Sequence, residues 1–171
     1  MRDFPLDDPV QRPTFYIKQF AVPGGTVASV QRGKVWDKLI QFRPDLIFLV
    51  IGGNDISLST DVTVLAKEIE NLAKRIEECT GGYCKIVGLE HRTHPHDMNA
   101  DEYTKAKNAV NLRLRRQLYW ARQRYMGMGM YREDLWDGVH LGTGACQRVL
   151  DYFLDVARSY FEKKDEREDA Q

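Results

Sequence analysis

The sequence has almost no net charge, few cysteines and no long apolar segment, and each shortage excludes a class of protein. Its 25 Lys and Arg residues balance 25 Asp and Glu residues over 171 residues, so no overall field favours nucleic acid or an anionic membrane. The longest apolar run has six residues, too few to span a bilayer, and the N-terminal segment lacks a signal-peptide pattern. We therefore expect a single cytoplasmic domain that binds neither membranes nor nucleic acid.

The three cysteines are too few for a disulfide framework, and they include no C-x-x-C pair of the kind that binds zinc. We expect Cys79 and Cys84 to be buried thiols on either side of a turn. A bridge between these two residues is the alternative if the protein is exported.

Apolar patterns predict strands and helices that alternate along the chain. The expected strands are Thr14 to Val22, Leu46 to Ile51, Cys84 to Leu89, and Tyr125 to Tyr131, the last of which equally fits a loop. The expected helices are Val27 to Gln41, Asp61 to Cys79, Ala100 to Arg124, and a closing helix from the cap Thr143 with the stripe Cys146, Val149, Phe153, Val156 and Tyr160. This alternation predicts parallel βαβ units and a three-layer α/β/α domain.

The domain is expected to occupy residues 14–162. Residues 1–13 contain three prolines and are expected to form an extended arm. Residues 163–171 are expected to be a charged, disordered tail.

The stretch from Asp45 to Asp55 organises the rest of the chain. Leu46 to Ile51 is continuously apolar, as in a strand buried on both faces of a parallel sheet, and Gly52-Gly53-Asn54-Asp55 follows it directly. Two glycines permit a sharp turn there. Because open α/β sheets bind ligands at the carboxyl ends of their strands, the pattern predicts a site at Asn54.

Three polar clusters are expected at this edge: Gly24-Gly25, Asn54-Asp55, and Asp137 with His140. A glycine N–H and an Asn amide are the donors that an oxyanion hole requires. A His with an Asp three residues before it is suited to act as a base whose tautomer the carboxylate fixes. The sequence thus predicts hydrolytic machinery, but no nucleophile stands in an evident position.

The segments PGGT at 23–26, IGGND at 51–55 and DGVHL at 137–141 resemble, in order and spacing, three sequence blocks of the SGNH (GDSL-type) hydrolases. The resemblance extends from about Thr14 to Phe161 and implies a flavodoxin-like α/β/α fold, and an esterase or deacylase that acts on a small ester or O-acyl group without metal or organic cofactor. It also implies that Gly24 and Asn54 donate to the oxyanion, that Asp137 orients His140, and that His140 is the base. Gly25, Gly53, Asp55 and His94 are expected to line the substrate site.

The chain departs from the family at the first block, a Gly-x-Ser, because no serine precedes Ser29. The strand that carries this serine is missing as well. Either upstream sequence supplies the nucleophile, or the lineage has lost it and the fold serves binding, so we expect little or no activity from the chain as given. Ser29, Ser57 and Ser59 are better explained as cap and turn residues than as substitute nucleophiles.

Other polar groups have simpler explanations. His91, His94 and His96, with Asp97, resemble metal ligands, but the proline between two of them and the lack of later ligands favour a polar wall of the substrate groove. The arginines of the 100–124 helix are expected to form a solvated face, with phosphate or RNA binding as the alternative; they are Arg113, Arg115, Arg116, Arg122 and Arg124. Unpaired strand edges left by the missing strand favour self-association, and a homodimer is the expected form.

Overall fold

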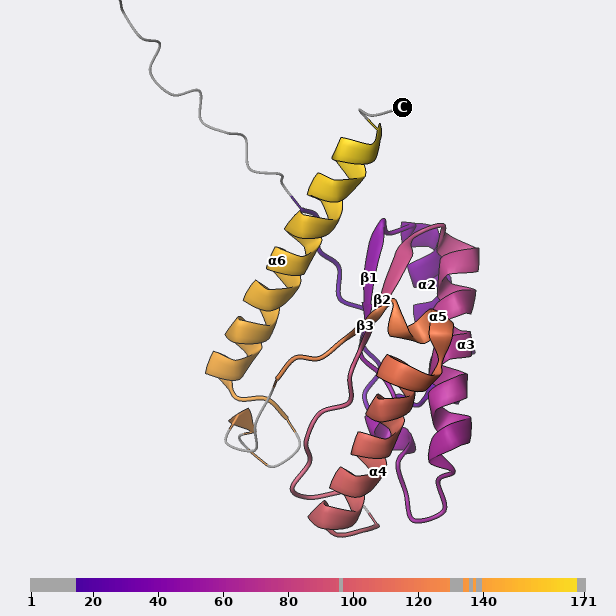
Figure 1. Cartoon of the computed structure of the whole chain (residues 1–171), viewed down its shortest axis with the longest axis vertical. Coiled ribbons are helices and arrows are strands. Elements are labelled where there is room, and N and C mark those ends of the chain that lie inside the picture. The colour runs from indigo at the N-terminus through magenta and orange to yellow at the C-terminus, as the bar shows by residue number, and fades with distance from the viewer. Residues whose placement is uncertain (1–14, 96, 130–133, 136, 138–139, 169–171) are drawn as a thin grey trace, which may run out of the picture.

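The structure, a computed structural model, describes residues 15–95, 97–129, 134–135, 137 and 140–168. Its centre is a sheet of three parallel strands in the order β1, β2, β3 (Figure 1). The strands are β1 (Leu46–Leu49), β2 (Tyr83–Val87) and β3 (Tyr125–Met126). The prediction of a parallel sheet is confirmed, although the strand expected at 125–131 has only two residues, and residues 130 and 131 lie outside the described part.

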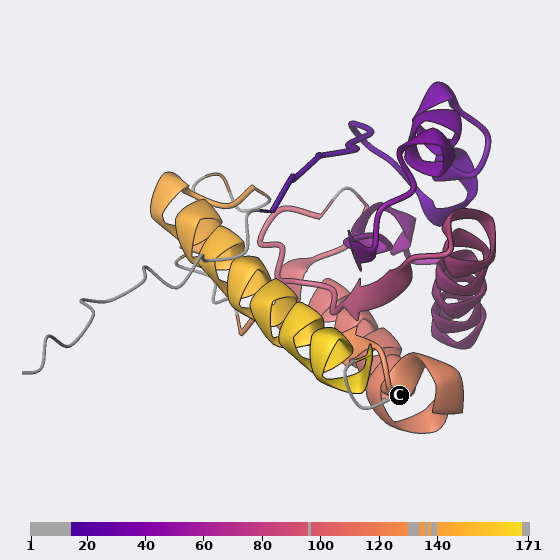
Figure 2. The ribbon, with the colours of Figure 1, turned by 90° about the horizontal axis from the view of Figure 1, so that it is seen from above.

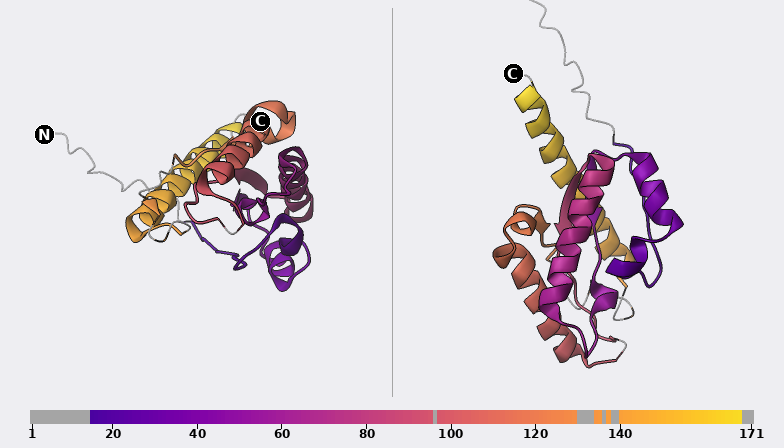
Figure 3. Two further views of the ribbon diagram at one scale, coloured as in Figure 1. Left: turned by 90° about the horizontal axis from the view of Figure 1, so that it is seen from below. Right: turned by 90° about the vertical axis from the view of Figure 1, so that its right-hand side faces the viewer.

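Helices lie on both faces of the sheet, an arrangement compatible with three α/β/α layers. One face is covered by α6, and the opposite face by a layer in which α3 lies between α2 and α4 (Figures 2 and 3). The helical elements are α1 (Val27–Val30), α2 (Lys34–Phe42), η1 (Gly53–Asp55), α3 (Val62–Thr80), α4 (Ala100–Leu112), η2 (Arg113–Gln117), α5 (Tyr119–Arg122) and α6 (Thr143–Glu168).

The central helix of its layer, α3, follows the predicted apolar stripe. Leu65, Ile69, Leu72 and Ile76 are all buried. The helix is capped by Asp61, whose carboxylate accepts hydrogen bonds from the backbone N–H groups of the first turn. This stripe and the apolar residues of β2 form the core of the domain.

The helix expected from Val27 to Gln41 is divided in two. Thr26 and Ser29 form a capping box around the short α1. Gly33 then adopts an extended conformation and becomes the N-cap of α2. The prediction of one continuous helix is wrong at Gly33, because glycine loses more conformational entropy in a helix than other residues do.

The strand expected from Thr14 to Val22 is also absent from the described residues, 15–22. Aromatic contacts hold this segment instead: Phe15 packs on Phe161, and Phe20 packs on Phe42. Strand-forming residues are not sufficient without a neighbouring strand, since the hydrogen-bond ladder and the cross-strand contacts supply the stability. Among the described residues, β2 is the only ladder partner of β1.

The helix expected from Ala100 to Arg124 is interrupted. The π-helical turn η2 follows α4, and Leu118 is extended before α5 begins. The buried carboxylate of Glu70 accepts a hydrogen bond from the Ala121 N–H at 3.2 Å, which satisfies a first-turn donor of α5. Sequence periodicity did not predict this break, because the apolar residues on both sides of it face the same core and continue one periodic stripe.

One arginine of the expected solvated face is engaged in the interior. Arg124 makes two hydrogen bonds to Glu77, of 2.8 and 3.0 Å, and lies over the Trp120 ring at 3.8 Å. Glu77 also accepts the Cys84 N–H at 2.8 Å. The prediction of a solvated role is therefore wrong for Arg124, which ties α3 to β2 and to the start of β3.

Helix α6 packs its half-buried aromatic residues against the sheet. Phe153 stacks on Phe48, and Tyr160 stacks on Tyr83. The expected stripe is wrong at Cys146, which is exposed while Ala145 is buried. The helix continues to Glu168, so the expectation of disorder over 163–171 is wrong as far as that residue, in keeping with the good helix propensities of Glu, Lys and Arg.

The cysteines are free thiols, and their burial differs from the prediction. Cys84 is buried, as expected, and its burial raises the pKa of the thiol to about 12. Cys79 is exposed, so the expectation of a buried thiol is wrong there. No helix within the described ranges is both long enough and apolar enough to cross a membrane.

Replacing Gly82 with alanine is expected to lower the free energy of unfolding by about 2 kcal/mol or more. A Cβ atom at this position would lie 2.0 Å from the Pro44 carbonyl oxygen, so the backbones that start β1 and β2 would have to separate. Urea denaturation measures the loss. Gly127→Ala is the matched control, because a Cβ at Gly127 meets no atom within 4 Å, and equal stability of the two variants would contradict the close approach.

Candidate functional site

Two glycine-containing turns that are distant in the sequence are joined at the carboxyl end of β1. The Asn54 side chain donates a hydrogen bond from Nδ2 to the Gly25 carbonyl oxygen at 3.0 Å. Both carboxylate oxygens of Asp55 accept the Val27 N–H, at 3.1 and 3.2 Å. The structure thus brings the predicted Gly24-Gly25 and Asn54-Asp55 clusters into direct contact.

Positive backbone angles and close contacts explain the glycines of these turns. Gly24 has a φ of 65° and Gly52 a φ of 105°, both in the left-handed region that glycine adopts readily. A Cβ at Gly53 would lie 2.8 Å from the Arg92 guanidinium, so this position must be small for the arginine to approach. Both polar backbone groups of Gly25 are occupied within the turn, because its N–H donates to Val22 and its carbonyl accepts from Asn54.

Asn54 is exposed, and its amide is held at both ends. Its Oδ1 accepts a hydrogen bond from Arg92 at 2.9 Å, while Nδ2 uses one hydrogen on Gly25. A primary amide has two N–H donors. The fixed orientation leaves the second N–H without a partner among the described residues, as an oxyanion donor requires.

Asp55, which was expected to line the substrate site, holds the start of α1. Burial raises the pKa of its carboxyl group, an effect that the hydrogen bond from Val27 opposes and that nearby Glu68 reinforces. Since Val27 is itself buried, its N–H would have no acceptor without this carboxylate. Asp55 therefore stabilises the PGGT turn through its hydrogen bonds with the Val27 N–H.

Asp55→Ala is expected to speed hydrogen exchange of the Val27 amide by about fivefold, because a typical hydrogen bond contributes about 1 kcal/mol. Hydrogen exchange followed by NMR measures this rate. Asp61→Ala is the matched control, because it removes an acceptor from the Thr63 and Val64 amides of α3 instead. Unchanged Val27 exchange in the Asp55 variant would show that another group holds the turn.

The predicted pair of Asp137 and His140 is formed. The two side chains meet at 2.6 Å between Oδ2 and Nδ1, and the His140 backbone N–H donates to the other carboxylate oxygen at 2.7 Å. With Nδ1 engaged by the carboxylate, the neutral imidazole carries its free lone pair on Nε2. The His140 side chain is 72% exposed, so that nitrogen is accessible.

The dyad and Asn54 come from different parts of the fold. Asn54 lies on η1, which follows β1, whereas the His140 segment leads directly into α6 (Figure 1). Asp134 holds this segment through an ion pair with Arg148 and through the Gly142 N–H, which donates to its carbonyl at 2.8 Å. No hydrogen bond links His140 with Asn54, and both residues belong to the described part of the chain.

The serines near the site have the cap and turn contacts expected of them. Ser29 accepts the Thr26 N–H at 2.8 Å and donates to the Thr26 carbonyl at 3.1 Å. Ser57 contacts Ser59 at 3.1 Å and Thr60 at 3.0 Å. None of these hydroxyl groups contacts His140.

The histidine loop, residues 90–99, lies beside the segment that follows η1, because Asp97 accepts the Leu58 N–H at 3.4 Å. His94 is exposed and bonds Thr93 at 3.0 Å, while His96 lies outside the described residues. Within the part of the chain that the structure describes, no group of three or more His, Cys, Asp or Glu side chains is arranged to hold a metal ion.

Three charged residues of this region were not predicted from the sequence as candidate site residues. Arg92 joins the site through Asn54. Lys107 is 5% exposed and lies 3.4 Å from His91. Burial raises the pKa of the nearby Glu90, although Lys107 and a hydrogen bond from the Met128 backbone oppose that shift. Lone charged residues in a polar loop and on a helix carry no periodicity, so only the tertiary structure could find them.

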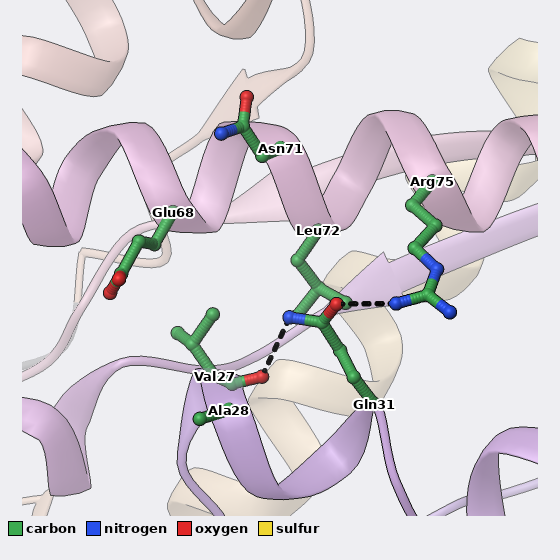
Figure 4. Close-up of a pocket in the computed structure, with 7 residues that line it drawn as sticks. All are labelled: Val27, Ala28, Gln31, Glu68, Asn71, Leu72 and Arg75. Carbon is green, nitrogen blue, oxygen red and sulfur yellow. Dashed lines mark hydrogen bonds between the residues drawn. The ribbon is translucent and has the colours of Figure 1, made fainter.

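An open hollow of about 300 Å³ lies apart from these residues, between α1 and α3 (Figure 4). Some of its polar groups pair with one another: Gln31 donates to the Val27 carbonyl at 3.1 Å, and Arg75 donates to Gln31 at 2.8 Å. We assign no ligand to it.

Neither a scan against protein-family models nor a search of the curated proteins finds a match to this chain.

Proposed function

We propose that this chain is an SGNH-type hydrolase-like protein, an esterase or deacylase for a small ester or O-acyl group. The observation that carries the proposal is the Asp137 and His140 pair at 2.6 Å, and the Asn54 amide, held by Gly25 and Arg92, would supply the oxyanion donor. The parallel sheet between helices agrees with a flavodoxin-like fold that lacks one central strand. The nucleophile would be a serine in polypeptide that precedes residue 1.

Each polar group has a role in acyl transfer. His140 Nε2 takes the proton of the serine hydroxyl as its oxygen attacks the ester carbonyl, and Asp137 stabilises the imidazolium that forms. The Gly24 N–H and the second Asn54 N–H donate to the oxyanion of the tetrahedral intermediate. His140 then protonates the leaving alcohol, and a water molecule activated in the same way releases the acid.

Steady-state hydrolysis of p-nitrophenyl acetate tests this function. A chain extended upstream through its own coding sequence to a Gly-x-Ser is expected to turn over the ester, whereas the chain as given is expected to show little or no turnover. A folded, extended chain without turnover would refute the proposal.

The second candidate is a non-catalytic binding domain on the same fold. It is favoured by the serines near the site, since Ser29, Ser57 and Ser59 are all engaged in cap or turn contacts. This candidate predicts that the coding sequence upstream of residue 1 contains no strand ending in Gly-x-Ser. An in-frame Gly-x-Ser would count against it.

A further inference from the structure

Arg92 is fixed beside the oxyanion donor by three contacts. Its Nη2 donates to Asn54 Oδ1 at 2.9 Å, its guanidinium lies against Gly53, and it lies over the buried Tyr103 ring at 5.8 Å. A guanidinium held by a hydrogen bond and an aromatic face has lost much of its rotamer freedom before any ligand arrives.

The charge of Arg92 has no carboxylate partner in the part of the chain that the structure describes. Within the described residues, no Asp or Glu oxygen lies within 4.0 Å of its guanidinium, whereas Arg124, Arg148 and Arg158 each pair with one. The side chain is half-buried, so water screens its charge less than that of an extended surface arginine. One of its five N–H donors is used on Asn54, and no described residue accepts from the others, which are thus available to a ligand.

We propose that Arg92 recognises an anionic group, so that the site takes esters that carry a carboxylate or a phosphate close to the scissile carbonyl. This inference rests on the proposed function. The planar guanidinium matches both anions with paired hydrogen bonds. Because Arg92 also donates to Asn54, an anion on the guanidinium places the neighbouring ester carbonyl beside the oxyanion donor.

Two pairs of esters test the charge preference on the chain as given, where no turnover is needed. Monomethyl succinate carries a carboxylate where dimethyl succinate carries a neutral ester. Methyl phosphonoacetate carries an ionised phosphonate where trimethyl phosphonoacetate carries its neutral dimethyl ester. NMR titration of the Asn54 side-chain amide and the Arg92 Nε–H measures affinity. The anionic member of at least one pair is expected to bind about tenfold more tightly, and the pair that shows the preference identifies the anion.

Variants show whether Arg92 is the cause. Arg92→Gln is expected to abolish the preference, and Arg92→Lys to retain part of it. Arg113→Gln is the matched control, because Arg113 also donates to a neutral side chain, Thr63, but lies on η2. If Arg92→Gln does not fold, the ester pairs and the Arg92→Lys variant still decide the question. Equal binding within both pairs, or an unchanged preference in a folded Arg92→Gln variant, would overturn the inference.

The outcome is separable from the proposed function. Anion preference in the chain as given, without hydrolysis by the extended chain, would preserve the role of Arg92 and reject the esterase. Equal hydrolysis of neutral and anionic esters by the extended chain would support the esterase and reject the role of Arg92.

Discussion

Replacing His140 with alanine, in the chain extended to its serine, is expected to lower kcat/KM for p-nitrophenyl acetate by roughly 10³-fold or more. The imidazole, held by Asp137 at 2.6 Å, is the group that takes up the serine proton in the proposed mechanism. Steady-state kinetics measure the loss. Because the His140 side chain is largely exposed, its removal should leave the stability of the fold nearly unchanged.

Asp137→Asn separates the orienting role from the base itself. An amide at this position can accept from Nδ1 but cannot stabilise the imidazolium, so a large loss of kcat is expected with the fold intact. Arg158→Ala on α6 is the control, because it removes a charged side chain that pairs only with exposed Asp155. Activity within tenfold of the parent in the His140 variant would mean that another residue is the base.

Glu77→Ala is expected to lower the free energy of unfolding by about 3 kcal/mol, the second large effect. The substitution leaves the Arg124 guanidinium, whose side chain is 15% exposed, without its carboxylate. It also leaves the Cys84 N–H without an acceptor at the start of β2. Urea denaturation of the two proteins measures the difference.

Glu78→Ala is the matched control, because Glu78 is the next residue of α3 and is exposed. Its loss should cost less than about 0.5 kcal/mol, as is typical of surface substitutions. Similar stabilities of the two variants would mean that the Arg124 contacts contribute little to the fold.

The parts of the fold that were predicted well are those that depend on strong local sequence patterns. The apolar run at 46–51 and the stripe of α3 are each determined by residues close together in the sequence, and both elements lie within a few residues of their expected bounds. The expected burial of the strand on both faces is wrong, because β1 lies at the edge of the sheet, its residues are half-buried and Val50 is 59% exposed. The strand expected at 14–22 failed because a strand depends on a partner elsewhere in the chain. Gly33 and Leu118 interrupt helices where periodicity alone continued them.

The candidate site was predictable where its residues follow strands or share a turn. Asn54 follows β1 directly, and the spacing of Asp137 and His140 places their side chains in contact. The sequence predicted that Asn54 and Gly25 lie at the same edge of the sheet, but it did not predict the hydrogen bond between them across 29 residues. Arg92 could not be found, because its importance depends on Gly53 and Tyr103, which only the fold brings beside it.

Labelling with a fluorophosphonate tests most directly whether the Asn54 amide and the Asp137 and His140 pair serve one reacting centre. In the extended chain, we predict a covalent adduct on the serine of the Gly-x-Ser, found by peptide mass mapping, and its loss in the His140→Ala variant. The chain as given should remain unlabelled. A folded, extended chain that stays unlabelled, or an adduct that forms equally well without His140, would contradict this assignment.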